Sequence, residues 1–355
     1  MIKKIYDCIK KADIFSSLAA FLLSLIIGGI IIAISGNSPL EAYRALFMGA
    51  FGSADALANT LGKATPLIFT GLAVSFSMKG GLLNIGAEGQ LYMGGFVAAL
   101  CGIYLKGMPN IVHIFVSLLC AGIGGGLIAS IAGFLKAKRN INEVIITIML
   151  NYIVIDLTDY LVSYPFKAKG MVAKTADVLD SARLTQLLPH SNLTSGIIIA
   201  LLFVIFVNWF IKNTVTGFEI RAMGYNKYAA ETGGVKLKSK IILTMFISGF
   251  IAAMAGATEI LGIHRYFIKG FSPGYGFDGI AVAVLAKNNP LGIVIAAILF
   301  GALRSGGMLL DRSTSIPGDF VVIIQALVII FVATPGIIKA LRLKKGGKKL
   351  EKQHC

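Results

Sequence analysis

Long apolar blocks separated by short polar segments make up almost the whole chain. Each block can form a helix that enters or crosses a membrane, although Gly276–Ala286 has only about half the length needed to cross. We therefore predict an all-α, polytopic membrane protein with about ten transmembrane helices. The ten blocks lie at residues 15–35, 57–78, 82–105, 111–135, 141–162, 195–211, 241–262, 276–286, 291–310 and 320–341.

The composition agrees with a membrane protein. Hydrophobic residues make up 56% of the chain and charged residues 14%, and the mean hydropathy is +0.81. A soluble domain of this composition would have too little polar surface. The net charge of +16 could suggest nucleic acid as a partner, but the positive residues cluster between the apolar blocks and at the two ends. Membrane topology explains that distribution better, so we expect contact with lipid and none with nucleic acid.

The distribution of basic residues also predicts an orientation. With ten spans and a cytoplasmic N-terminus, about two thirds of the 33 lysines and arginines lie on the cytoplasmic side. Leaving out the short block would put the basic C-terminal segment on the opposite face. We thus predict a cytoplasmic tail at 1–14, a transmembrane domain at 15–341 and a basic cytoplasmic tail at 342–355. The first apolar run is interpreted as a retained anchor rather than a cleaved signal.

Two loops of this topology are long enough to carry a function. The segment 163–194 is predicted to be external, and loops of that length are often functional. It is either a contact for an external partner or a plain surface loop. The segment 214–240 is predicted to be cytoplasmic.

A polar, glycine-rich stretch interrupts the apolar pattern at Lys79–Gly95, KGGLLNIGAEGQLYMGG, and is called the first interruption here. Non-helical backbone at membrane depth is tolerated only where protein buries it or where it lines a cavity. An ionisable residue inside a span is costly, which makes Glu88 a candidate functional residue. The alternative is a tight cytoplasmic turn with Glu88 at an interface.

The second interruption, Lys269–Gly279, reads KGFSPGYGFDG and resembles the start of the first. A lysine and three glycines match, and Asp278 stands opposite Glu88. On the charge-based topology the two copies are inverted, and inverted repeats with broken helices line the path in many transporters. The alternative is that both stretches carry glycines only for close packing.

The fifth predicted span carries a polar strip that includes Asn151 and Asp159. These two residues are eight positions apart and share one helix face. The strip either faces a solute pathway or bonds neighbouring spans together. The candidate pathway residues are Asn84, Glu88, Gln90, Asn151 and Asp278.

Within the loop 214–240, residues Phe218–Thr232 are predicted to form one short helix that ends at Gly233 and Gly234. Its apolar side has too little bulk for a strong lipid anchor, so we favour docking of a partner protein over a helix lying on the lipid surface.

Three stretches carry a family resemblance: GFEIRAMGYNKYAAETGGV, NIGAEGQLYMGG and RNINEVIITIMLNYI. The first resembles the cytoplasmic coupling loop of bacterial ABC importer permeases in the branched-chain amino acid, ribose and nucleoside group. The second resembles a signature of the same group, and the third looks most like its nucleoside and simple-sugar branch. The whole is most similar to the larger permease subunit of purine nucleoside importers.

This resemblance implies a permease in the bacterial plasma membrane that imports nucleosides or related small polar solutes. It further implies a second permease subunit in a heterodimer, a separate ATP-binding subunit and a lipid-anchored solute-binding protein. The chain departs from the family's G-x-N-P-x-A-A run at Tyr225 and Lys227, which leaves the start of the coupling helix open. The coupling residues implied are Phe218, Arg221, Ala222, Gly224, Asn226, Ala229, Ala230 and Gly234.

Other chemistries lack a motif in this sequence. No phosphate-binding GxxxxGK[ST] loop occurs, and the four histidines have no metal-ligand spacing. We therefore expect no catalytic residues, metal or cofactor in this chain, and an energy source on another subunit. The main alternative is an ion-coupled secondary transporter of a small polar solute, which inverted repeats and Glu88 also fit. A membrane-embedded enzyme would need a catalytic group that we do not find.

Overall fold

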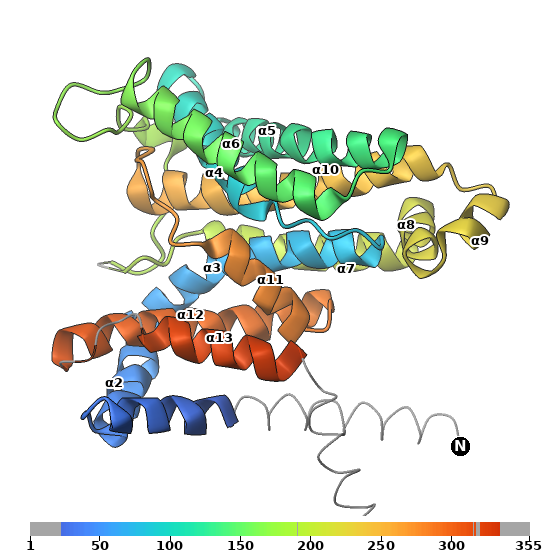
Figure 1. Cartoon of the computed structure of the whole chain (residues 1–355). Helices are drawn as coiled ribbons and strands as arrows, with labels where there is room; N and C mark the ends of the chain where they lie inside the picture. The colour runs from blue at the N-terminus through green and yellow to red at the C-terminus, as the bar shows by residue number, and fades with distance from the viewer. Residues whose placement is uncertain (1–22, 190, 315, 317–319, 334–355) are drawn as a thin grey trace, which may run out of the picture. The chain divides into compact units, whose positions relative to one another are not determined.

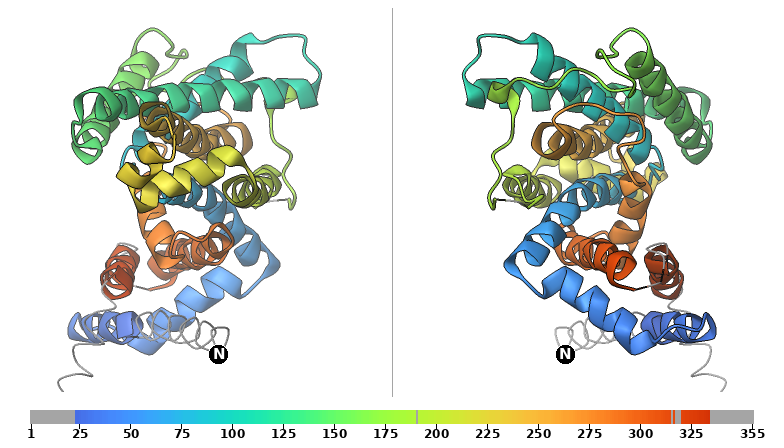
Figure 2. Two further views of the ribbon diagram at one scale, coloured as in Figure 1. Left: turned by 90° about the vertical axis from the view of Figure 1, so that its right-hand side faces the viewer. Right: turned by 90° about the vertical axis from the view of Figure 1, so that its left-hand side faces the viewer.

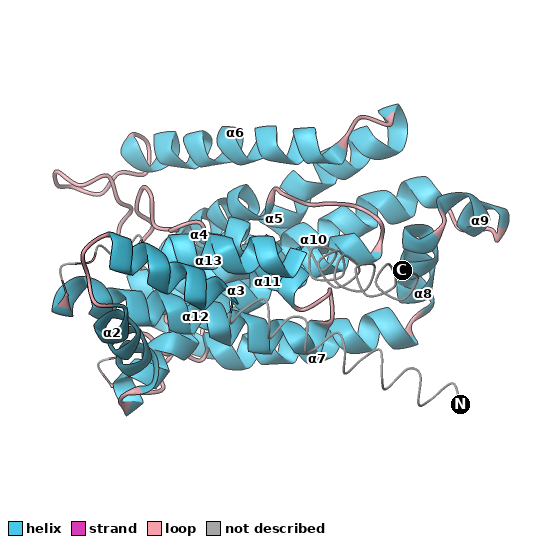
Figure 3. Ribbon diagram, turned by 60° about the horizontal axis from the view of Figure 1, so that its bottom comes forward, coloured by secondary structure: helices cyan, strands magenta, loops and turns pink. Residues whose placement is uncertain are grey.

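The fold was analysed in a computed structural model that describes residues 23–189, 191–314, 316 and 320–333. These residues form helices joined by turns and loops (Figure 3). The described residues contain no β-strand, only two isolated β-bridges. The predicted all-α class is therefore confirmed. The predicted tails at 1–14 and 342–355 lie outside the described residues.

Every predicted apolar block contains a helix in the part of the chain that the structure describes. These helices are Leu23–Ile34, α3 (Ala54–Lys79), α4 (Ala87–Tyr104), α5 (Asn110–Arg139), α6 (Glu143–Ser163), α7 (Gly196–Asn213), α10 (Leu237–Glu259), α11 (Tyr275–Leu285), α12 (Pro290–Ser313) and α13 (Phe320–Ala333). A π-helical turn, η2 (Ile260–His264), extends α10.

Among the described residues, six helices are long and apolar enough to cross a membrane: α3, α5, α6, α7, α10 with η2, and α12. The chain is therefore a multi-pass membrane protein, but the count of ten spans is not confirmed. The helix α11 has 11 residues and is short, as the pattern predicted. One helix was not predicted, α2 (Pro39–Phe51), because its mixed polar and apolar sequence falls between two apolar blocks.

The described chain divides into two compact units, and the division falls within α2 and α12. In the unit Ala50–Ser305, α10 packs against α3, α4 and α5. Small residues allow the backbones of these helices to approach closely: a Cβ added at Gly256 would lie 1.9 Å from the carbonyl oxygen of Leu91. Close approach through small residues is a common way for membrane helices to associate.

The other unit combines residues 1–49 with residues 306–355. Its described part holds the helix Leu23–Ile34, most of α2, the end of α12, and α13. Tyr43 of α2 donates a hydrogen bond from its hydroxyl to the carbonyl oxygen of Leu25. A Cβ added at Gly306 of α12 would lie 2.3 Å from the carbonyl oxygen of Leu46, so α2 and α12 also pack backbone to backbone.

Within the unit Ala50–Ser305 the two long loops lie at opposite ends of the helices (Figure 1). The loop after α6 is at the left, and it contains a short 3₁₀ turn, η1 (Asp180–Ala182). Its backbone bonds to the segment after η2: Val178 N donates to Arg265 O at 2.8 Å, and Thr175 N donates to Phe267 O at 2.9 Å. Two short helices, α8 (Val215–Tyr225) and α9 (Lys227–Thr232), lie at the right and face the viewer in the left panel of Figure 2.

The prediction of one helix over Phe218–Thr232 is wrong in one respect, because the chain breaks at Asn226. This residue has extended backbone angles, and its Oδ1 atom accepts hydrogen bonds from the N–H groups of Tyr228 and Ala229 at 3.0 and 3.1 Å. Asparagine is among the best N-caps. Asn226 therefore fixes the start of α9 without a proline at the first helical position, which Lys227 occupies.

Candidate functional site

The first interruption begins where α3 ends. Gly80 caps α3, Gly81 has a φ of +72° and α4 starts at Ala87, so the intervening residues leave the helix inside the bundle. Asn84 is fully buried in this break. Its Oδ1 accepts from Gly86 N at 2.9 Å, and its Nδ2 donates to Gln90 Oε1 at 2.9 Å.

The network of Asn84 continues into the neighbouring helices. Its Nδ2 also lies 2.9 Å from the Oγ of Ser248 in α10, and that hydroxyl donates to the carbonyl oxygen of Ala73 in α3 at 2.7 Å. Gln90 returns a second bond from Nε2 to Asn84 Oδ1 at 3.1 Å. These amides therefore hold α3, α4 and α10 together at the break.

Asn151 supports the same break from α6. Its Oδ1 accepts from Gly89 N at 2.7 Å and its Nδ2 donates to Ile85 O at 2.8 Å. Gly89 is in the first turn of α4, whose N–H groups have no partner within the helix. Asn151 thus supplies the hydrogen bonds that a continuous helix would have made, which backbone at membrane depth requires.

Glu88 connects the first interruption to the second. The side chain is 3% exposed, and its Oε2 accepts from the N–H of Gly276, in the first turn of α11, at 2.5 Å. The side chain of Ser272 also bonds to this carboxylate. A negative charge at a helix N-terminus interacts favourably with the helix dipole. Gly276 has no room for a side chain, since a Cβ there would lie 2.3 Å from Glu88 N. The contact between Glu88, at the start of α4, and Gly276, at the start of α11, is called the seam below.

An ion pair holds the second interruption. Arg304 of α12 donates from Nε and Nη2 to Asp278 Oδ2 at 2.9 and 2.7 Å, and from Nη2 to the carbonyl oxygen of Pro273 at 3.0 Å. The two charged side chains are each 19% exposed. The Arg304 guanidinium also lies 5.0 Å from the ring centre of Tyr275. One ion pair and one stacked ring therefore fix the start of α11.

Several polar residues near the seam were not predicted. Glu259, at the end of α10, is buried, and its Oε2 lies 3.6 Å from His264 Nε2. The charges of Lys63 and Arg304 act on the Glu259 carboxylate. The hydroxyl of Tyr275 is buried without a hydrogen-bond partner among the described residues. Glu259 and Arg304 are ionisable residues inside predicted spans, so the rule that selected Glu88 could have found both.

The five predicted pathway residues fall into two groups in the structure. Glu88 and Asp278 sit on either side of the seam, whereas Asn84, Gln90 and Asn151 form the bonded network on the side of the first interruption. Their role along a solute path stays a prediction. The described residues contain no group of three or more potential metal-ligating side chains.

The short helices α8 and α9 contact the first interruption. A Cβ added at Gly224 of α8 would lie 2.2 Å from the carbonyl oxygen of Lys79, so α8 packs directly on the end of α3. Glu219 of α8 forms an ion pair with Lys240 of α10 at 2.5 Å. The side chain of Met223 packs in a buried cluster with Leu82 of the break.

The predicted coupling residues fall on different faces of α8 and α9. The side chain of Phe218 is 61% exposed. Tyr225, at the end of α8, is not among the predicted coupling residues, and its side chain is 88% exposed. Among the remaining predicted residues, Gly224, Asn226, Ala229 and Gly234 are also exposed, Arg221 and Ala222 are half-buried, and Ala230 is buried.

These observations define a multi-pass helical membrane protein in which two polar breaks meet inside the bundle and short helices at one end are open to a partner. The sequence profile of the family described as branched-chain amino acid transport system permease component matches residues 56–333. The chain belongs to this family. It is a permease subunit of an ABC transporter, in which a separate subunit binds and hydrolyses ATP.

Three relatives align over most of their length. The chain is 40% identical to the guanosine ABC transporter permease protein NupP of Bacillus subtilis over 338 residues, which cover 93% of this chain and 96% of the relative. It is 33% identical to the nucleoside ABC transporter permease protein NupB of Lactococcus lactis over 94% of each chain. It is 31% identical to the glucose ABC transporter permease protein TsgB13 of Haloferax volcanii, over 91% of this chain and 87% of the relative.

Membership of this family identifies ATP hydrolysis as the energy source. Permeases of ABC transporters depend on ATP hydrolysis by a partner, so the alternative of an ion-coupled secondary transporter is not supported. The predicted resemblance and the prediction of a non-enzymatic permease are confirmed.

Proposed function

We propose that this chain is a permease subunit of an ATP-driven importer for nucleosides or related small polar solutes, with simple sugars as a second possibility. Relatives named for guanosine, nucleosides and glucose support this range. We further propose that it pairs with a second, different permease subunit and receives solute from a lipid-anchored solute-binding protein.

The proposed orientation places both termini and α8–α9 in the cytoplasm of a bacterial cell. The loop 163–194 is then external. The side chain of Met171, which lies in this loop, is almost fully exposed. We propose that this loop contacts the solute-binding protein.

The proposed solute path passes the seam, near Asn84, Glu88, Gln90, Asn151 and Asp278. Carboxylates and amides suit the hydroxyl and N–H donors of a neutral polar solute. The bond from Gly276 N to Glu88 closes the seam in the described conformation. A solute can pass when this bond opens, and its own donors can replace Gly276 on the carboxylate.

The observation that carries the proposal is the contact of α8 with the end of α3. Gly224 packs on the carbonyl oxygen of Lys79, and Met223 packs on Leu82 in the break. A displacement of α8 by a bound ATPase therefore moves the first interruption with it. Because the amide network ties the break to the start of α4, we propose that Glu88 moves as part of the same body and separates from α11.

ATP-dependent uptake of radiolabelled guanosine into vesicles that hold the complete transporter tests this proposal. We expect Arg221→Ala combined with Gly224→Pro to abolish uptake while the chain is still present in the membrane, because proline breaks α8 at its contact with Lys79. Unchanged uptake would refute the coupling role. If glucose competes with guanosine and other nucleosides do not, the nucleoside assignment is wrong, and the permease assignment remains.

A further inference from the structure

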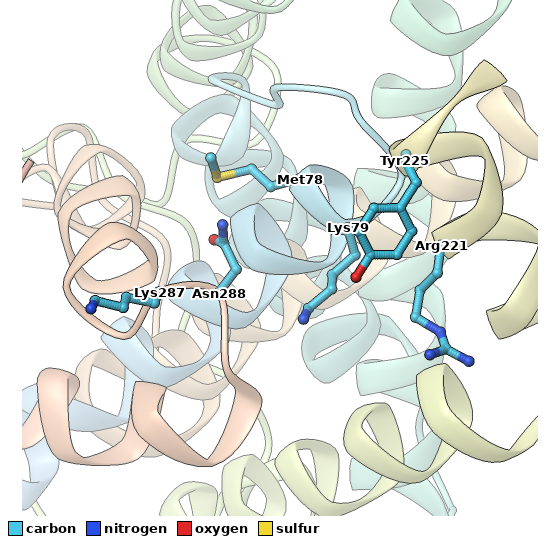
Figure 4. A pocket seen from close by; sticks show the side chains of 7 residues that line it. Met78, Lys79, Arg221, Tyr225, Lys287 and Asn288 are labelled. Carbon is cyan, nitrogen blue, oxygen red and sulfur yellow. The ribbon is translucent and has the colours of Figure 1, made fainter. Parts of the chain in front are cut away.

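A pocket of about 220 Å³ lies where α8 meets the start of the first interruption and the turn after α11. Seven residues line it, and they come from the end of α3, from α8 and from the turn that follows α11 (Figure 4). In Figure 4, Lys79 lies between Asn288 on one side and the pair Arg221 and Tyr225 on the other. The pocket therefore joins the three elements that the proposed coupling must connect.

The pocket is strongly basic. Lys79, Arg221 and Lys287 line it, and none of its seven described lining residues carries a carboxylate. The charge of Arg221 acts repulsively on the ammonium of Lys79. Glu219, the acidic residue of α8, is already paired with Lys240. Like charges held close together destabilise a site unless an anion joins them.

Two residues that line this pocket each carry a side-chain atom without a partner among the described residues. Both Arg221 Nε and the side-chain Oδ1 of Asn288 are buried without a hydrogen bond. Buried polar atoms are normally bonded, so each of these two residues carries hydrogen-bonding capacity that the described chain leaves unused. Lys287 and Asn288 also have φ angles of 51° and 55°, in the left-handed region that non-glycine residues seldom adopt. The N–H groups of these two residues bond to Val284 O and Ala283 O, so the left-handed turn closes the end of α11.

The position of the pocket favours a protein partner over a lipid headgroup. Lys79 is half-buried at the end of α3, a helix that is mostly buried inside the bundle. Tyr225, at the rim, is 88% exposed on the face that α8 offers to a partner. A bound ATPase that covers α8 would also cover this pocket.

We propose that the pocket binds a carboxylate side chain of the ATP-binding subunit. This inference rests on the proposed docking role of α8. The carboxylate accepts from the Arg221 guanidinium and the Lys79 ammonium, so one acidic residue of the partner bonds to α8 and α3 together. Lys287 also lines the pocket, and its side chain extends away from Lys79 in Figure 4.

Zero-length cross-linking of the assembled transporter with a carbodiimide tests this proposal, because the reagent joins an amine only to a carboxylate in direct contact. We expect a cross-linked peptide pair in which Lys79 or Lys287 is bonded to an aspartate or glutamate of the ATP-binding subunit. The pair should disappear in Lys79→Gln with Lys287→Gln. An assembled complex with cross-links only at other lysines, or with none, would overturn the proposal.

Charge variants give a second readout. Lys79→Glu with Arg221→Glu should lower retention of the ATP-binding subunit by about tenfold, because like charges meet across the interface. Lys138→Gln with Arg139→Gln removes two exposed cations from the same end of the bundle and should not change retention. Once the cross-linked acid is known, reversing its charge should restore binding to the double glutamate variant. Failure of this exchange would overturn the proposal.

Two further outcomes distinguish a partner carboxylate from a free anion, and the pocket from the docking helix. If inorganic phosphate changes the ATPase rate of the native complex at constant ionic strength, and does not in the Lys79→Gln, Arg221→Gln variant, the pocket holds a free anion instead of a partner carboxylate. If Gly224→Pro releases the ATPase and the charge variants do not, the docking role of α8 stands and the pocket proposal fails.

Discussion

The two interruptions begin alike in sequence but are stabilised by different interactions. In the first, neutral amides bond to one another and to backbone, and Asn84, Gln90 and Asn151 are all buried. In the second, a partly exposed ion pair between Asp278 and Arg304 fixes the start of α11. The amides of the first interruption are therefore a fully bonded support, whereas the carboxylates at the seam, Glu88 and Asp278, can change partner.

This difference suggests how one bundle can be both rigid and able to open. A saturated amide network has no alternative partners within reach, so disrupting it exposes several unsatisfied groups at once. A carboxylate that accepts one N–H at the seam can exchange that donor for water or for a solute. Four substitutions, from the largest expected effect to the smallest, test the comparison.

Asn151→Ala should have the largest effect on stability. It leaves Gly89 N and the carbonyl oxygen of Ile85 buried without partners, which costs about 2–4 kcal/mol of unfolding free energy when the two losses are combined. Thermal unfolding of the purified permease in detergent measures this loss of stability. Tyr152→Ala, at the exposed neighbouring position, is the control and should change little. Equal effects of the two variants would mean that the network is not a support.

Gly276→Ala should cost less stability and almost all transport. The added methyl would lie 2.3 Å from Glu88 N and must push α11 away from α4. Overpacking of this kind costs about 1–3 kcal/mol, so much of the protein should still fold. We expect ATP-dependent uptake per folded molecule to fall at least tenfold. Gly292→Ala is the matched control, because the nearest atom to the added methyl would be 3.4 Å away. Retained uptake in Gly276→Ala would contradict a closely fitted seam.

Asp278→Asn should have a moderate effect at the second interruption. It leaves the Arg304 guanidinium, 19% exposed, without its charged partner, although the amide oxygen that remains can still accept a hydrogen bond. Uptake should fall severalfold, because Arg304 then lacks the anion that positions α11. The exchange Asp278→Arg with Arg304→Asp should recover part of it. Asp55→Asn, at an exposed position in the first turn of α3, serves as a control without effect on uptake.

Asn226→Ala should have the smallest effect and leave both interruptions intact. It removes the N-cap of α9, which costs about 1 kcal/mol of local helix stability. Hydrogen exchange should become faster in Lys227–Thr232 and stay unchanged around Asn84. Asn226→Asp retains the accepting oxygen and should keep α9 protected. If the alanine variant instead speeds exchange at Asn84, the docking helices and the first interruption share one unfolding unit.

Much of the fold could be predicted from the linear pattern. Apolar length alone located a helix in every block and showed that α11 is short, whereas the count of ten spans, which included it, is not confirmed. The break at Asn226 could not be located, because α8 and α9 together have the periodicity of one helix and only the capping geometry separates them. The unpredicted helix α2 lacks the long apolar run on which the prediction depended.

The site was harder to predict than the fold. The sequence singled out Glu88 and Asp278 because each is an acid beside glycines within an apolar region. It could not show that Glu88 bonds to Gly276, 188 positions away, or that Asn151 bonds to the backbone of the break. Such contacts depend on packing between helices that are distant in sequence, and the pattern along one chain does not record them.

The central claim is that docking moves the first interruption as one body and opens the seam to α11. Hydrogen exchange of the reconstituted transporter, measured without nucleotide and with ATP trapped by vanadate, tests it directly. We predict faster exchange in Ser272–Asp278, which contains the Gly276 amide, and continued protection of Asn84–Gln90. Loss of protection in Asn84–Gln90 with no change in Ser272–Asp278 would contradict the account.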